Sequence, residues 1–396
     1  MKRSATAVAG ELAALAQRSQ RRARRVVESL ATGGTILAPV VDGRRLVNFC
    51  SNDYLGLAGD PRVNTALQAA AQRWGTGSGA AHLVTGHTAE HHALEEELAA
   101  FTGREAALLF STGYMANVGV IAALAGHGEL VLQDRLNHAS LIDGARLSGA
   151  RLLRYAHADA AAAARLADEH AAALTLIATD GVFSMDGDVA PLRRLAATAR
   201  QHDAWLLVDD AHGFGVLGAS GGGSLQVAGL SADEVPLLVG TLGKACGTFG
   251  AFVAGNREVI DLVLQRARSY IYTTALPPAV AAATRASLMI LREEGWRRAR
   301  LGQHIARFRA GAARRGLPLA ASGTPIQPVP VPGAAHCLAA SRGLMERGFW
   351  VSAIRHPTVP AGTERLRVTL SAGHGEEQVD ALLDALAEVL PPAGAT

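Results

Sequence analysis

The chain has 396 residues, 49% of them hydrophobic and 18% charged, which is enough for two unequal domains with large buried cores. A formal net charge of +3 is too small to indicate a nucleic-acid-binding protein. Five arginines do gather between Arg18 and Arg25, and we interpret them as a solvated helix face or an anion site.

The cysteines also limit the class of protein. Cys50, Cys246 and Cys337 are far apart and form no CxxC pair, which argues against a disulfide framework or a zinc cluster. Since we find neither a signal peptide nor an apolar window of membrane length, we expect a cytoplasmic protein that does not enter a membrane.

The first expected elements are a helix and a hairpin. Residues 9–30 are predicted to form one amphipathic helix. The following stretch APVVDGRRLVNFCSND predicts a short hairpin, because Asp42-Gly43 is a dipeptide typical of tight turns between strands. Together they make an N-terminal arm over residues 1–50.

Short apolar runs then alternate with helical patterns. The runs are almost entirely apolar, as expected for strands that are covered on both faces of a sheet. This pattern predicts an α/β fold, with a large doubly wound domain and a mainly parallel sheet over residues 51–277. The predicted strands are residues 106–110, 129–134, 174–180, 204–210, 236–242 and 250–255.

A different pattern follows residue 277. A long helical region over residues 278–315 precedes a proline-rich stretch, two strand-like runs and a final helix over residues 376–390. We therefore expect a smaller α+β domain over residues 278–396.

Three motif matches are weak. GTLGKA resembles a phosphate loop, but Ala245 stands where a hydroxyl would bind magnesium. GFGVLG is a GxGxxG sequence and suggests an NAD-dependent oxidoreductase, yet a glycine-rich loop follows where a dinucleotide site needs a helix. HTAEH would place His87 and His91 on one helix face, but no third ligand is evident, so we predict no metal site.

Other polar residues follow the ends of predicted strands, where open α/β sheets bind ligands. Asp209 ends one apolar run and precedes His212, while Thr241 and Lys244 follow the next run. A lysine among glycines and apolar residues suits a Schiff base, because such surroundings lower the pKa of its amine. The cofactor would be pyridoxal phosphate, whose ring nitrogen Asp209 can pair with. A lysine in a surface turn is the alternative.

Two further loops fit the same cofactor. FSTGYMAN places Gly113 and Tyr114 between a strand and a helix, where their backbone N–H groups can bind a phosphate. DRLNHASLIDG places His138 after another strand, available to stack on a ring.

With these motifs, and with NFCSNDYLGL, DGVFSMDGD and IYTTALPP, the chain resembles the α-oxoamine synthases over about residues 10–390. These fold-type I pyridoxal-phosphate enzymes condense an amino acid with an acyl-CoA and release CO2. HLVTGHTAEHHALEEELA and AIRHPTVPAGTERLR are most similar to the biotin-pathway member. The resemblance implies L-alanine and pimeloyl-CoA or pimeloyl-acyl-carrier protein as substrates, and a homodimer with shared active sites.

The resemblance also implies roles for single residues. Lys244 would hold the cofactor and move the Cα proton, Asp209 would pair with the pyridinium nitrogen, and His138 would stack over the ring. The other cofactor contacts would be Gly113, Tyr114, Ser184, His212, Thr241 and, from the partner subunit, Thr274.

Substrate contacts are implied in the same way. Asn52 and Arg367 would hold the amino-acid carboxylate, and Thr358 would contact the acyl substrate together with an N-terminal arginine, for which the alignment favours Arg25. The chain departs from the family pattern at Asp180, where a glutamate is expected, and at Cys246, where a phenylalanine is expected.

Several alternatives share this chemistry. They are glycine C-acetyltransferase, 5-aminolevulinate synthase and serine palmitoyltransferase. A non-catalytic partner subunit is a further alternative, against which the intact Lys244 argues.

Overall fold

The computed structural model describes residues 5–30 and 36–390 and divides them into two units. The smaller unit consists of the described parts of Met1–Tyr54, Met185–Gly187 and Ala299–Thr396, and the larger unit consists of Leu55–Ser184 and Asp188–Arg298. The expected arm and small domain also include residues 1–4, 31–35 and 391–396, which lie outside the described residues.

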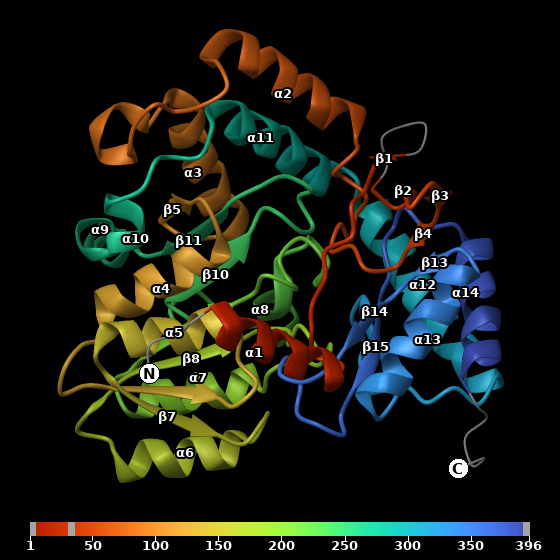
Figure 1. Cartoon of the computed structure of the whole chain (residues 1–396). Coiled ribbons are helices and arrows are strands. Elements are labelled where there is room, and N and C mark those ends of the chain that lie inside the picture. The colour runs from red at the N-terminus through yellow and green to blue at the C-terminus, as the bar shows by residue number, and fades with distance from the viewer. Residues whose placement is uncertain (1–4, 31–35, 391–396) are drawn as a thin grey trace. The chain divides into compact units, whose positions relative to one another are not determined.

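A seven-stranded sheet with the order β5–β11–β10–β9–β8–β6–β7 forms the centre of the larger unit (Figure 1). Neighbouring strands are parallel except where β11 pairs with β10 and with β5. The predicted, mainly parallel sheet is thus present. Its strands are β5 (Ala106–Phe110), β6 (Leu130–Asp134), β7 (Arg151–Tyr155), β8 (Leu174–Asp180), β9 (Trp205–Asp209), β10 (Leu237–Thr241) and β11 (Ala251–Gly255).

Helices cover both faces of this sheet. Val131 and Val239 belong to the core that the sheet shares with α4, α5 and α9, whereas Leu132 and Val208 belong to the core that it shares with α6 and α7. Burial on both faces explains the almost continuous apolar runs. The helices of this unit are α2 (Pro61–Trp74), the π-helix η1 (His82–Gly86), α3 (Ala89–Thr102), α4 (Gly113–Leu124), α5 (Ala139–Ser148), α6 (Ala160–Glu169), α7 (Leu192–Gln201), α8 (Gly223–Ala228), α9 (Arg257–Arg266), α10 (Arg268–Ile271) and α11 (Pro278–Glu293).

Strand β7 is absent from the predicted strands. It lies at the edge of the sheet beside β6, and its residues Arg151 and Arg154 are exposed. A strand at an edge keeps polar side chains in water. It therefore lacks the continuous apolar run by which the inner strands are recognised.

The smaller unit contains a three-stranded sheet of order β12–β15–β14. The predicted hairpin is confirmed, because β2 and β3 pair antiparallel around Asp42 and Gly43, with φ of 51° and 70°. The elements are α1 (Ala5–Gln17), β1 (Ser29–Leu30), β2 (Pro39–Val41), β3 (Arg44–Arg45), β4 (Val47–Asn48), α12 (Gly295–Arg314), β12 (Ile326–Pro330), α13 (Ala334–Glu346), β13 (Phe349–Trp350), β14 (Ser352–Ile354), β15 (Arg365–Thr369) and α14 (Glu376–Val389).

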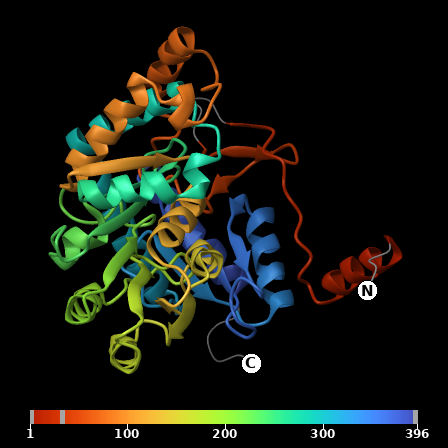
Figure 2. The same cartoon turned by 90° about the vertical axis from the view of Figure 1, so that its left-hand side faces the viewer.

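The prediction of one helix over residues 9–30 is wrong. Helix α1 ends at Gln17, Ser19 has a left-handed φ of 56°, and the chain continues as an extended segment (Figure 2). In a continued helix the arginines after Ser19 would stand three and four residues apart, where like charges destabilise a helix.

The boundary expected at residue 277 also differs from the structure. Helix α11 packs on α2 and α3, and Arg285 bridges to Glu90 and Glu97 of α3 at 2.8 Å each. The larger unit therefore continues to Arg298. The expected single helical region contains two helices, α11 and α12.

Two glycines of α12 allow a matched test of core packing. A Cβ added to Gly311 would lie 2.3 Å from Leu383 Cδ1 of α14, whereas a Cβ added to Gly302 meets nothing within 4 Å. Gly302→Ala should stabilise the protein by up to about 1 kcal/mol through helix propensity. Gly311→Ala should destabilise it by about 1–3 kcal/mol through overpacking. Urea unfolding measures both changes, and an equal effect of the two variants would contradict the described packing of α12 on α14.

Candidate active site

Two buried carboxylates lie side by side where β8 and β9 end. Asp180 and Asp209 are paired in the sheet register and are only 4% and 5% exposed. Asp209 accepts hydrogen bonds from Asn117 Nδ2 at 2.6 Å and from the Ala211 N–H at 3.0 Å. Burial, followed by the negative charge of Asp209, raises the pKa of Asp180. Such a pair favours a cation beside it.

A chain of hydrogen bonds connects Asp209 to His138. Asn117 Nδ2 also donates to Ser140 Oγ at 2.8 Å, and Ser140 Oγ lies 2.7 Å from His138 Nδ1. The Ser140 N–H donates to the same ring nitrogen, so the neutral ring carries its proton on Nε2. The backbone N–H of His138 donates to Asp180 Oδ2 at 2.6 Å. The shorter side chain at position 180 therefore still reaches the His138 loop.

The His138 ring is available to a ligand. The residue keeps an exposed surface, although the protein atoms around it lower its pKa by desolvation. A neutral ring with an outward Nε2–H can stack on a planar group and donate a hydrogen bond.

Lys244 lies in the loop between β10 and β11, and β10 is the neighbour of β9 in the sheet. Its Nζ is 3.1 Å from Nε2 of the buried His212, and Lys244 itself is partly buried. It is the one lysine within the described residues. The loop is restrained: Thr241 Oγ1 donates to the Gly250 carbonyl at 3.1 Å. The geometry does not match the alternative of an exposed surface turn.

Close backbone approach restrains the same loop at Gly247. This residue has a φ of +66°, and a Cβ there would lie 2.3 Å from Ala58 N. The side chain of Cys246, one residue earlier, is fully buried, and Ser287 Oγ donates to its carbonyl at 2.7 Å. The cysteine that departs from the family pattern therefore lies in the core.

Gly113 and Tyr114 form the first turn of α4, directly after β5. Thr112 caps the helix by accepting from the Met115 N–H at 3.2 Å, and a Cβ built on Gly113 meets nothing within 4 Å. The Tyr114 hydroxyl donates to Asp143 at 2.7 Å, so this side chain is already bonded, and the backbone N–H groups are what the turn offers. An open helix N-terminus of this kind suits a phosphate.

The two remaining predicted cofactor contacts of the larger unit, Ser184 and Thr274, differ in how exposed they are. Ser184 follows β8 in the segment after Asp180 and is partly buried. Thr274 lies at the surface, in the segment between α10 and α11.

In the smaller unit the predicted carboxylate contacts come together. Arg367 on β15 is 7% exposed, and its Nη1 and Nη2 donate to Asn52 Oδ1 at 3.4 and 3.3 Å. Its Nη1 also donates to Thr369 Oγ1 at 3.0 Å. A buried guanidinium with an amide beside it suits a carboxylate.

The structure does not bring Arg25 to Thr358. Arg22 Nη2 donates to Thr358 Oγ1 at 3.2 Å, whereas Arg25 pairs with Asp42 at 3.0 Å. Arg355 fixes this register by donating to the carbonyls of Ser19 and Arg21. Sequence reasoning missed Arg22, since a run of arginines contains no signal that distinguishes one from the next.

The GFGVLG motif has a structural explanation. A Cβ on Gly213 would lie 2.1 Å from Asp210 Oδ1, and a Cβ on Gly223 would lie 1.9 Å from Oδ2. The Ser224 N–H donates to Oδ2 at 2.7 Å. These glycines therefore let the loop close around a buried carboxylate. The helix that follows, α8, is only six residues long and begins at Gly223, five residues after the motif, whereas a dinucleotide site has a helix that starts within the motif.

The HTAEH motif lies at the N-terminus of α3 and does not place His87 and His91 on one helix face. His87 precedes the N-cap Thr88 of α3, and His91 faces the interior. The two ring nitrogens of His91 are bonded to the Thr88 N–H and to the Leu276 carbonyl.

Comparison with known proteins identifies the family. The model of the aminotransferase class I and II family matches residues 44–386. The chain belongs to this family. It is 61% identical to 8-amino-7-oxononanoate synthase from Methylococcus capsulatus, over 97% of this chain and 98% of the relative.

Two solved structures show the same fold. Serine palmitoyltransferase from Sphingomonas wittichii has a TM-score of 0.91 and 32% identity, covering 97% of this chain and 96% of that one. The 8-amino-7-oxononanoate synthase from Francisella tularensis has a TM-score of 0.77 and 32% identity, covering 87% and 97%. These matches confirm the predicted fold-type I architecture. None of the described helices has the length and apolar character needed to cross a membrane.

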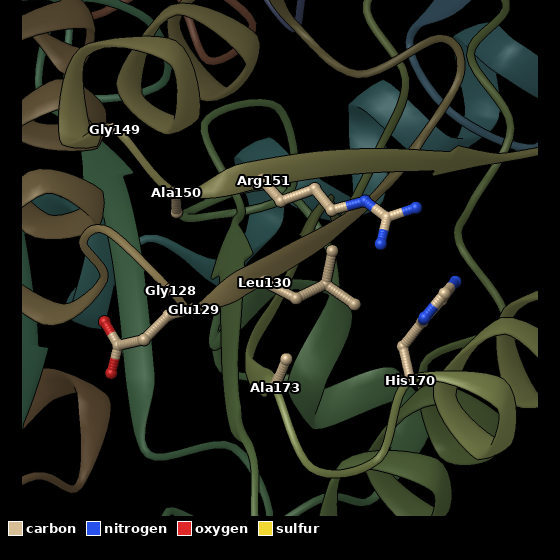
Figure 3. Close-up of a pocket in the computed structure, with 8 residues that line it drawn as sticks. All are labelled: Gly128, Glu129, Leu130, Gly149, Ala150, Arg151, His170 and Ala173. Atoms are coloured by element: carbon tan, nitrogen blue, oxygen red, sulfur yellow. The ribbon is translucent and has the colours of Figure 1, made fainter.

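One cavity of about 340 Å³ lies elsewhere in the larger unit (Figure 3). Leu130 and Arg151, which line it, begin β6 and β7. The cavity therefore lies at the amino ends of these strands. The candidate active site lies at the carboxyl ends of the strands, where ligands bind in open α/β sheets.

The Asp210 carboxylate predicts a pH effect on stability. Burial raises its pKa from 3.8 to about 7. The folded state therefore binds this proton more tightly than the unfolded state does. The resulting stabilisation of the folded state is complete below about pH 4 and is lost as the pH rises through 7. Asp210→Asn removes the titration and keeps an acceptor for the Ser224 N–H. Between pH 4 and 7, urea unfolding should show the wild type losing stability relative to this variant. Parallel stability curves would contradict the prediction.

Proposed function

We propose that the chain catalyses the decarboxylative condensation of L-alanine with a pimeloyl thioester of CoA or acyl-carrier protein. The products would be 8-amino-7-oxononanoate, CO2 and the free carrier, a step of biotin biosynthesis. The observation that carries the proposal is the partly buried Lys244, whose Nζ lies next to His212 at the same edge of the sheet as Asp209. The chain that contains this arrangement belongs to the aminotransferase class I and II family. Curated relatives at 55–61% identity carry the name 8-amino-7-oxononanoate synthase.

The described residues fit pyridoxal phosphate. Gly113 leaves open space at the N-terminus of α4 for a phosphate, and Asp209 accepts hydrogen bonds from the Asn117 amide and the Ala211 N–H, which hold its side chain in place. Solved serine palmitoyltransferases of the same fold are described with this cofactor. When bound, pyridoxal phosphate supplies a cationic ring that accepts the electron pair released at the Cα of an amino acid.

The protein's own groups would then position the cofactor and move protons. Asp209 would hold the proton of the ring nitrogen, and His138 would lie over the ring. Lys244 would attach the cofactor, then take the Cα proton on Nζ and return it, with His212 at 3.1 Å to orient the amine. Gly113, Tyr114 and Thr241 would bind the phosphate.

The substrate contacts would come from the smaller unit. We assign the alanine carboxylate to Arg367 and Asn52, because the two already share hydrogen bonds. We assign the acyl substrate to Thr358 and Arg22 in place of Arg25. A free carboxylate at the far end of a pimeloyl chain suits a guanidinium.

Three other activities are less well supported. Glycine C-acetyltransferase and 5-aminolevulinate synthase use the same chemistry, but the relatives at 55–61% identity cited above carry a different name. An NAD-dependent oxidoreductase rested on GFGVLG, whose first glycine, Gly213, lies against the Asp210 carboxylate.

We also propose a homodimer in which Thr274 of the partner subunit contacts the phosphate. Large apolar side chains near Thr274 are exposed in the single chain, among them Val84 at 74% and Tyr272 at 70%. Exposed apolar groups of this size favour a protein interface.

The three cysteines are free thiols, in agreement with the expected reducing cytoplasm.

The activity is tested directly with purified protein, pyridoxal phosphate and pimeloyl-CoA. L-Alanine should give 8-amino-7-oxononanoate and CO2, detected by mass spectrometry and with carboxyl-labelled alanine. Glycine and L-serine should react at least tenfold more slowly, because one methyl or hydroxyl group in a fitted pocket changes rates by about this factor or more. Preferred turnover of glycine with acetyl-CoA or succinyl-CoA would overturn the assignment.

Arg22 and Arg25 form a matched pair for the acyl site. Arg22→Ala should raise the KM for pimeloyl-CoA about tenfold or more, because a charged hydrogen bond contributes about 1.5–3 kcal/mol. Arg25→Ala removes an exposed ion pair with Asp42 and should leave this KM within about twofold. If Arg25→Ala raised the KM for pimeloyl-CoA more than Arg22→Ala does, the prediction from sequence that Arg25 contacts the acyl substrate would be restored.

A further inference from the structure

Histidines gather in the larger unit on η1 and at the start of α3. Three residues there, His87, His92 and Glu95, each offer a ligand atom, and these atoms lie within 4.8 Å of one another. The proposed condensation uses none of the three. His91, the second histidine of the HTAEH motif, is not available as a ligand, since both of its ring nitrogens are bonded inside the protein.

Surrounding contacts orient two of the three groups. His87 Nδ1 lies 3.1 Å from His82 Nδ1, which leaves Nε2 facing Glu95 Oε2 at 3.9 Å. Glu95 Oε1 accepts from the Leu109 N–H at 2.9 Å, which leaves Oε2 for a ligand. Histidines that bind metals typically bond their other ring nitrogen to a neighbour, and carboxylate ligands are held in the same way.

His92 completes the set from the surface. It stands three residues before Glu95 on α3, so the two side chains leave the same side of the helix. Its ring is 67% exposed, and its Nε2 is 3.5 Å from Glu96 Oε1. The exposed side chain of His92 is free to rotate toward His87 and Glu95, and a small approach of those two groups would close the three ligands around an ion.

We propose that His87, His92 and Glu95 bind a divalent transition-metal ion of the zinc type. Two imidazoles and a carboxylate are ligands that Zn²⁺ accepts, with water in the fourth position. His87 lies directly after η1, and the other two ligands lie on α3. The ion would therefore fasten η1 to α3 and stabilise the folded larger unit.

The test uses the holoenzyme after removal of metal with a chelator. The wild type should bind a single zinc ion per chain from zinc-buffered solution, measured by plasma mass spectrometry, and its melting temperature should rise with zinc. His92→Ala and Glu95→Gln should weaken binding at least tenfold and abolish the rise. Glu95→Gln keeps the acceptor for Leu109, and His336→Ala, which removes an exposed histidine of the smaller unit, should bind zinc as the wild type does.

The results distinguish zinc bound by His87, His92 and Glu95 from zinc bound elsewhere on the protein. A wild type that retains no zinc would overturn it. Equal retention by the wild type, His92→Ala and Glu95→Gln would also overturn it, because the ion would then be bound elsewhere, for instance near His138. Zinc content is measured without turnover, so the outcome is independent of the condensation reaction.

Discussion

The structure of the larger unit depends on two carboxylates that are buried on neighbouring strands. Asp180 and Asp209 stand at paired positions where β8 and β9 end, and removing two like charges from water costs free energy unless donors and a cation compensate. Asn117 and backbone N–H groups provide the donors. A cationic pyridine ring at this position would satisfy the carboxylates, and the same carboxylates would keep that ring protonated.

Two glycines that follow β9 are required by a similar constraint. Asp210, next to Asp209, has its carboxylate so close to Gly213 and Gly223 that any side chain at these positions would collide with it. The loop after β9 thus closes on a buried acid, and it carries His212 to Lys244. A sequence motif that resembles a nucleotide site is here a packing requirement.

The sequence predicted those features whose determining residues lie close together in the chain. Inner strands and the Asp42-Gly43 turn have short-range patterns, and both were predicted correctly. Asp209 and Lys244 were predicted to belong to one site because parallel strands bring their carboxyl ends to one edge of the sheet. The contact of Arg22 with Thr358 depends on Arg355, which is more than 300 residues from Arg22 in the sequence, and no local pattern encodes it.

The central claim is that Lys244 binds pyridoxal phosphate covalently, and borohydride reduction tests it most directly. The chain has only two lysines, Lys2 and Lys244, so peptide mass spectrometry can assign the reduced adduct without ambiguity. The account predicts a yellow protein whose adduct lies on Lys244 and is prevented by prior addition of L-alanine. A colourless protein, or an adduct confined to Lys2, would contradict it.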